Sequence, residues 1–226
     1  MRKIDRTCVL MTVMLVASAA MLWAAVTPYS QDFEGLPIGD PNALANDGWN
    51  FYVNVAAPTP YGYGGPAPNG PQICAIAAGE GGPSQGAQQL SVYSDYNNAD
   101  HGNGYLIETN VYQEQTIEAG DVGVTVDFTF DAKMGNLGGS STALAFIKTL
   151  DPNNGYAQTN FVTQNTTNTP ATWTTYNLQL PIDAGLVGQI LQIGFSTTAT
   201  NYEPCGVFYD NVNQPVPVEL MSLSVE

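Results

Sequence analysis

The chain has 226 residues, with 20 Asp or Glu against 5 Lys or Arg, and its formal net charge is −15. This length fits one domain, or two at most, and can build a sizeable core. Arg2, Lys3 and Arg6 stand at the N-terminus, so beyond residue 26 only Lys133 and Lys148 face 19 acids, a net charge of −17. So few cations argue against nucleic-acid partners and against attraction to anionic lipid. The same charge suits either cation binding or a salty medium that screens self-repulsion.

The N-terminus has the pattern of an export signal. Residues 8–26 carry no charge, follow the basic start, and include small residues around Ala17, Ala20 and Ala25. This predicts a secretory signal peptide over residues 1–26. An uncleaved anchor is the alternative, because the run of 19 residues is near the length of about 20 that spans a bilayer. Either way we expect a secreted or cell-surface protein that contacts no membrane beyond this segment.

Two cysteines remain after the signal, Cys74 and Cys205. In an oxidising compartment such a pair favours a disulfide, which would stabilise the fold by roughly 4 kcal/mol in the chain-entropy model. Two unpaired thiols are the alternative.

The rest of the chain has the pattern of strands, with no long amphipathic helix. Alternation is clearest after residue 121, where one set of side chains faces one way: Val122, Val124, Val126, Phe128 and Phe130. A period of two indicates a half-buried strand. The predicted strands cover residues 50–55, 72–77, 89–94, 105–117, 122–131, 144–150, 156–163, 175–180, 191–196 and 206–212. Strands at this spacing, separated by turn signals, predict an all-β antiparallel sandwich or barrel.

Two segments differ in composition from these strands. Residues 56–72 are rich in Pro and Gly, and we interpret them as a long surface loop of a single domain over residues 27–213. Residues 214–226 form a Pro-containing C-terminal tail, either an extension or a remnant linker.

Several segments, in order, resemble the jelly-roll carbohydrate-binding modules of the galactose-binding-like superfamily. They are residues 31–35 (QDFEG), 111–121 (VYQEQTIEAGD), 122–133 (VGVTVDFTFDAK), 172–180 (TWTTYNLQL), 191–195 (LQIGF) and 206–212 (GVFYDNV). The resemblance spans residues 31–213. It implies a jelly-roll sandwich and does not fix the ligand.

The resemblance also implies a structural calcium ion. In the family the opening acid and the acid of the last strand share it, and these positions fall on Glu34 and Asp210. Asp32 and Asp40 are further candidate donors. Asp210 shares the strand parity of Phe208 and Val212, which look core-facing, and a lone buried carboxylate is costly unless it is paired or bound to a metal. Ca²⁺ takes six to eight oxygen ligands. The alternative is that these are ordinary solvated acids.

Candidate sugar ligands are aromatic rings in polar, loop-like surroundings. Trp49 and Trp173 adjoin predicted strands, so we expect both to pack in the fold. The better candidates lie among Gly, Asn and Asp: Tyr61, Tyr63, Tyr93, Tyr96 and Tyr105.

The sequence offers little for catalysis. His101 is the single histidine, no Gly-x-Ser-x-Gly elbow is present, and no usual zinc set can be assembled. The leading hypothesis is therefore a non-catalytic, calcium-stabilised domain that binds extracellular or cell-surface glycan. A structural or adhesive surface protein, assembling with other surface proteins, is the second. A small glycoside-cleaving enzyme is the third, and it would need two carboxylates about 5–10 Å apart.

Overall fold

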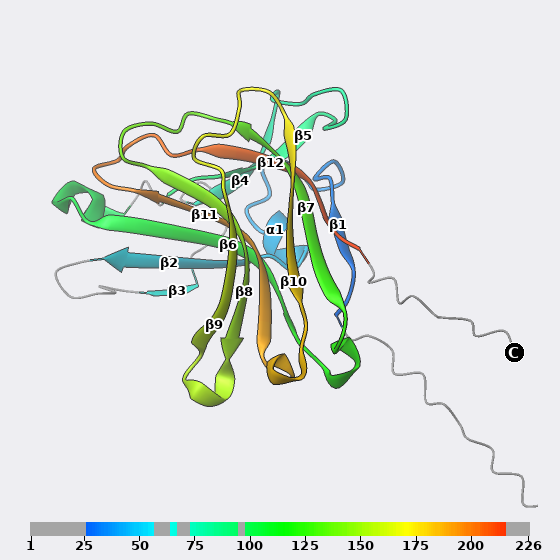
Figure 1. Ribbon diagram of the computed structural model, residues 1–226. Coiled ribbons are helices and arrows are strands. Elements are labelled where there is room, and N and C mark those ends of the chain that lie inside the picture. Colours follow the sequence, from blue (N-terminus) through cyan, green and yellow to red (C-terminus); the bar gives the residue numbers. More distant parts are fainter. Residues whose placement is uncertain (1–25, 57–63, 67–72, 95–97, 216–226) are drawn as a thin grey trace, which may run out of the picture.

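The computed structural model describes residues 26–56, 64–66, 73–94 and 98–215, and these form two antiparallel sheets that face each other (Figure 1). Sheet A contains β1 (Tyr29–Gln31), β4 (Cys74–Ala78), β5 (Gln88–Val92), β7 (Thr125–Met134), β10 (Thr174–Pro181) and β12 (Val207–Gln214). Sheet B contains β2 (Asn50–Ala56), β3 (Gly64–Pro66), β6 (Leu106–Thr116), β8 (Thr142–Asp151), β9 (Ala157–Asn165) and β11 (Ile190–Ala199). The predicted all-β jelly-roll sandwich is confirmed.

Helical segments in the described residues are short and lie in connections. They are α1 (Ala43–Asn46), η1 (Ala99–Asn103), η2 (Ala119–Asp121), η3 (Pro152–Asn154) and η4 (Ala184–Leu186). No helix of the described residues combines the length and apolar character that a membrane crossing requires.

Sheet A has the strand order β10-β7-β12-β5-β4. On one side β12 pairs with β7, and on its other side it pairs with two strands, first β5 and then β1. β5 pairs with residues 207–209, and β1 pairs with residues 212–214. The register between β12 and β7 shifts between Asp210 and Asn213, and Asn211 has a left-handed φ of 46°. Asp210 and Asn211 lie between the pairings with β5 and β1, and we call this position the gap beside Asp210.

Sheet B has the order β3-β2-β6-β11-β8-β9 and contributes the opposite inner face. Alternate residues of both sheets meet in the core. Phe195 stacks on Tyr209 with ring centroids 3.7 Å apart, and Trp49 also contacts Phe195. Trp49 therefore packs in the core, as expected.

The period-two pattern identified the core faces of most strands. Val124, Val126, Phe128 and Phe130 are buried, whereas Val122 precedes β7 and is 43% exposed. In residues 144–150 the core-facing positions are Ala145, Ile147 and Thr149, so Leu144, Phe146 and Leu150 face outward. The pattern missed the short strands β1 and β3.

Residues near the two ends of the described chain are held by contacts with the rest of the domain. Val26 is 2% exposed and its backbone N–H donates to Asp121 Oδ1 over 2.9 Å. Gln214 is buried and pairs with Tyr29. The rest of the predicted signal and nearly all of the predicted tail lie outside the described residues.

Candidate functional site

The outer face of sheet B carries aromatic and polar side chains in adjacent rows. The register aligns Tyr112, Gly194 and Phe146 across β6, β11 and β8. Gly194 has no side chain, and a Cβ there would lie 2.6 Å from Tyr112 Cβ. The missing side chain therefore allows the backbones of β6 and β11 to approach closely at Tyr112.

The next row holds Glu114, Gln192, Lys148 and Phe161, on β6, β11, β8 and β9. Gln192 Nε2 donates to Glu114 Oε2 over 2.7 Å. Lys148 Nζ lies 4.7 Å from the ring centroid of Phe146 and 5.9 Å from that of Phe161. Burial lowers the pKa of Lys148, while Glu108 and Glu114 act in the opposite direction. This row thus contains one carboxylate, which is hydrogen-bonded to Gln192, and one ammonium group, which lies beside the Phe146 and Phe161 rings.

These rows enclose a pocket of about 530 Å³. It is lined by Tyr52, Asn54, Asn110, Tyr112, Glu114, Lys148, Leu150, Tyr156, Ile190 and Gln192. Ligand pockets of this size typically combine apolar and aromatic walls with a few placed polar groups. We refer to it as the sheet B groove.

Tyrosines give the sheet B groove its aromatic surface. Tyr156 follows η3 with a left-handed φ of 60° and is 61% exposed, so its ring stands at the rim. Burial raises the pKa of Tyr112 to about 12, with Glu114 and Tyr52 contributing in the same direction. Its hydroxyl is therefore protonated at ordinary pH and can donate a hydrogen bond. The groove offers flat rings, amide donors and acceptors, and one ammonium group.

A second cluster lies on sheet A, at the gap beside Asp210. Asp210 is fully buried, and its backbone neighbour Asn211 donates its N–H to Asp210 Oδ1 over 2.6 Å. The other oxygen, Oδ2, is buried with no hydrogen-bond partner among the described residues. Desolvation by burial raises the pKa of Asp210 to about 7, and the charges of Asp131, Asp32 and Glu34 add to that increase.

The prediction that Phe208 and Asp210 face the core was wrong. Phe208 and Asp210 both point to the outer face of sheet A, and Val207 and Tyr209 point into the core. The bulge at Asn211 returns Val212 to the core side. Asp32 and Glu34 lie near Asp210, and Asn211 Nδ2 donates to the Ser84 carbonyl, so the segments that contain these residues cover the outer face at this point.

Two glutamines add unpartnered oxygens at the same gap. Leu90 of β5 pairs with Tyr209, so the register places Gln89 beside Asp210. Both polar side-chain atoms of Gln89 and Oε1 of Gln88 are buried without a hydrogen-bond partner among the described residues. We call Asp32, Glu34, Gln88, Gln89 and Asp210 the β12 gap cluster.

Glu34 ties the cluster to the start of β5. Glu34 Oε1 accepts the N–H groups of Ala87 at 2.7 Å and Gln88 at 2.6 Å, and its carbonyl accepts from Gln88 Nε2. Asp32 Oδ1 accepts the N–H of Glu34. Both acids are exposed, whereas Phe33 between them is buried.

The fourth candidate donor, Asp40, has a different role. Its Oδ1 accepts the N–H of Asn42 just before α1, and it is not among the charges that act on Asp210. Asp131 takes its place in the acidic group and was missed by the sequence reasoning. It lies on β7, directly opposite Asp210. The alternation places Asp131 on the outward face of its strand, and this was the one sequence feature that could have indicated it.

The two predicted ligand tyrosines among the described residues, Tyr93 and Tyr105, do not line the same site. Tyr93 lines a separate hollow on sheet A, and Tyr105 packs against the core. Tyr61, Tyr63 and Tyr96 lie outside the described residues. The groove tyrosines Tyr52, Tyr112 and Tyr156 were not predicted as ligands, although the outward parity of the first two on their strands could have indicated them.

His101 is buried in η1, where its Nε2 lies 3.1 Å from Ser94 Oγ and its ring contacts Tyr202. Cys74 and Cys205 are both buried. No disulfide bond joins them within the described part of the chain, so the bridge stays a prediction.

No protein-family model matches this chain, and a search of curated proteins found no match. Solved structures with a similar fold include the enzymatically active domain of tailspike protein 4 from bacteriophage CBA120 (15% identity, TM-score 0.44), which aligns with 73% of this chain. This chain spans only 19% of that tailspike chain.

Two further similar structures match over nearly their whole length. One is the C-terminal family 22 carbohydrate-binding module of Clostridium thermocellum Xyn10B (15% identity, TM-score 0.46, 85% of this chain and 96% of that chain). The other is the Stig cyclase Fisc from Fischerella sp. TAU (15% identity, TM-score 0.48, 85% of this chain and all of that chain).

Proposed function

We propose that this chain is a secreted, non-catalytic carbohydrate-binding domain that binds extracellular or cell-surface glycan in the sheet B groove. The observation that carries the proposal is the groove itself, in which Tyr52, Tyr112 and Tyr156 adjoin Asn, Gln and Lys side chains. A sugar ring has an apolar face of C–H groups and a rim of hydroxyls. Tyrosine rings suit the first, and amide and ammonium groups suit the second.

The two other hypotheses receive less support from the groove. An adhesive protein would use a broad apolar or edge-strand surface, and on edge strand β9 the large exposed side chain is Phe161, at 46%. A glycoside-cleaving enzyme needs two carboxylates about 5–10 Å apart across a cleft. Glu114 is the one carboxylate among the described residues that line the groove.

A glycan array, followed by calorimetry on the best ligand, tests the proposal. Tyr156→Ala should weaken binding about ten-fold or more, because it removes the rim ring. Tyr202→Ala is the matched control. Tyr202 is also exposed (46%) and has a similar left-handed φ of 56°, but it is not a groove residue. Binding to no glycan, or equal losses in both variants, would move the assignment to the adhesive hypothesis.

We propose further that the β12 gap cluster holds a structural calcium ion. Among the described residues no three His, Cys, Asp or Glu side chains are close enough to hold a metal ion by themselves. Calcium also takes amide and carbonyl oxygens. The buried, unpartnered oxygens of Asp210, Gln88 and Gln89 supply such donors, with Asp32 and Glu34 beside them.

A bound divalent cation would supply positive charge where the chain has none. Lys133 and Lys148 are the only cations after residue 6, and neither pairs with Asp210. An unsatisfied buried carboxylate costs several kcal/mol, so a cation here would tie β12 to the segments that follow β1 and precede β5. Thermal unfolding with EDTA and with added CaCl₂ tests this. An unchanged midpoint in the two conditions would refute the calcium site.

A further inference from the structure

The outer face of sheet A has its own hollow, of about 520 Å³, which lies beside the β12 gap cluster and on the other sheet from the sheet B groove. The register aligns Ala75, Ser91, Phe208 and Lys133 in one row across β4, β5, β12 and β7. Phe208 is half-buried in the middle of this row. The Phe208 ring, which lies between Ser91 and Lys133 on this outward face, forms the floor of the hollow.

Two glycines, Gly135 and Gly206, line the hollow beside Phe208. Gly206 and Gly135 follow in the next outward row, since Val207 pairs with Met134. A Cβ on Gly135 would lie 3.4 Å from Phe208 Cε2 and 2.5 Å from the carbonyl oxygen of Gly206. Asn136 fixes this pair, because its Oδ1 accepts the Gly206 N–H over 2.8 Å. The hollow therefore belongs to the sheet's own backbone geometry.

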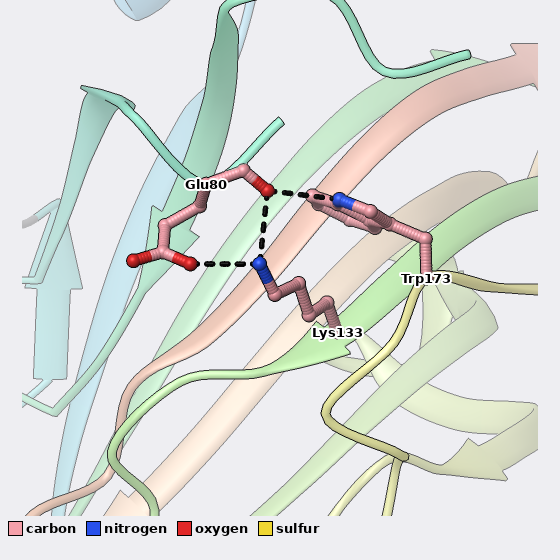
Figure 2. Close-up of polar contacts among 3 residues, drawn as sticks. All are labelled: Glu80, Lys133 and Trp173. Atoms are coloured by element: carbon pink, nitrogen blue, oxygen red, sulfur yellow. Dashed lines mark hydrogen bonds and ion pairs between the residues drawn. The ribbon is translucent and has the colours of Figure 1, made fainter. Parts of the chain in front are cut away.

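One wall is held by a three-residue contact (Figure 2). Lys133 Nζ donates to the Glu80 carbonyl over 3.0 Å and forms an ion pair with Glu80 Oε2 at 2.7 Å. Trp173 Nε1 donates to the same carbonyl over 2.9 Å. Trp173 thus anchors this wall, which agrees with its expected packing role. The ion pair offsets the charge of Glu80, so the hollow is close to neutral in a strongly acidic protein.

The polar groups at the rim complete the lining. Tyr93 and Met134 border the hollow together with Ser91, Asn136 and Glu80. Half-buried rings with hydroxyl, amide and carboxylate groups around them resemble the sheet B groove in chemistry. Lys148 lines the sheet B groove, and Lys133 lies beside Phe208 in the hollow on sheet A.

We infer that this hollow is a second glycan-binding site, which takes a neutral sugar unit on Phe208 and Tyr93. The ligand class rests on the proposed function, but the site is separate, because the hollow lies on sheet A and the groove lies on sheet B. The outer faces of a sandwich point in opposite directions. A domain with one site on each face binds two glycan segments at once and links two polysaccharide chains.

Calorimetry with neutral hexasaccharides (gluco-, xylo-, manno- and galacto-configured) measures the number of sites. We expect two sites in the natural protein. Phe208→Ala removes the floor ring, and Ser91→Arg fills the hollow while leaving the core intact. Each should reduce the stoichiometry to one, as should Tyr112→Ala on the other face. Tyr202→Ala and Thr125→Arg, an exposed position on β7, are the ring and charge controls.

Linking of chains gives a second readout. A soluble polysaccharide that binds the protein should turn turbid with the natural protein and stay clear with Phe208→Ala, Ser91→Arg or Tyr112→Ala. One site that is lost in Tyr112→Ala and unaffected by Ser91→Arg and Phe208→Ala would overturn the second site and leave the proposed function standing. Binding of none of these sugars or of any array glycan would instead overturn the proposed function.

Discussion

Asp210 and Asp131 lie directly opposite each other on neighbouring strands, and both carboxylates are buried. Their partners differ. Asp131 accepts hydrogen bonds from Gln85 Nε2, Asn211 Nδ2 and Thr175 Oγ1. Asp210 has one oxygen with no partner among the described residues. One acid of the pair is thus part of a satisfied network, and the other is left for a cation.

This difference predicts opposite effects of the same substitution in cation-free protein. Asp131→Asn replaces one accepting oxygen with an NH₂ group that faces other hydrogen-bond donors. It should therefore destabilise the fold by about 1–3 kcal/mol. Asp210→Asn removes an unpaired buried charge and should leave the free energy of unfolding at neutral pH unchanged or higher. Urea unfolding in EDTA measures both. Equal destabilisation by the two variants would contradict the distinction.

The same carboxylate predicts a pH dependence. Burial raises the pKa of Asp210 from its ordinary value of 3.8 to about 7 in the folded, cation-free protein. Asp210 therefore binds a proton more tightly in the folded state than in the unfolded state. This tighter binding contributes fully to stability below about pH 4, and the contribution is lost as the pH rises through about 7. In EDTA, the stability of the natural protein minus that of Asp210→Asn should fall over this range, and a flat difference would contradict the assignment.

Calcium should reverse that loss. With CaCl₂ at pH 7 to 8 we expect the melting midpoint of the natural protein to rise, by mass action on the folded state. Asp210→Asn and Glu34→Gln should weaken this response. Asp40→Asn should keep it, because Asp40 caps the turn before α1. Equal responses in all three variants would place the ion elsewhere.

The sequence predicted the sandwich well because burial on one face imposes a period of two. It predicted Asp210 and Glu34 as neighbours only through the resemblance. The bulge at Asn211 reverses the parity of β12, and alternation alone cannot reveal a residue with a left-handed φ inside a strand. This is why Phe208 and Asp210 were assigned to the core face.

The sheet B groove was missed for a related reason. Tyr52 and Tyr112 are far apart in the sequence, and each looks like an ordinary outward residue of an amphipathic strand. They line one groove because β2 pairs with β6 and β6 pairs with β11. Strand order and register are set by long-range pairing, and the alternation within one strand does not indicate which strand it pairs with.

Gly194 tests the shape of that groove. In Gly194→Ala the new Cβ would meet the carbonyl oxygen of Val111 and lie 2.6 Å from Tyr112 Cα. Tyr112 must then shift, so we expect glycan affinity to fall about ten-fold and stability to fall by about 1–3 kcal/mol. Gly138→Ala is the control, since its nearest neighbour is 4.0 Å away. Unchanged affinity with an intact fold would remove Tyr112 from the binding surface.

The cysteine pair offers the last test. Cys74 of β4 pairs with Val92, which also pairs with Val207, and Cys205 precedes Val207 by two residues. The N–H of Ser94 donates to Cys205 Sγ over 3.0 Å. If export oxidises the pair, dithiothreitol should lower stability by up to about 4 kcal/mol in the natural protein. Cys74→Ser and Cys205→Ser should show no response to the reductant. Two titratable thiols in unfolded protein prepared without reductant would contradict the bridge.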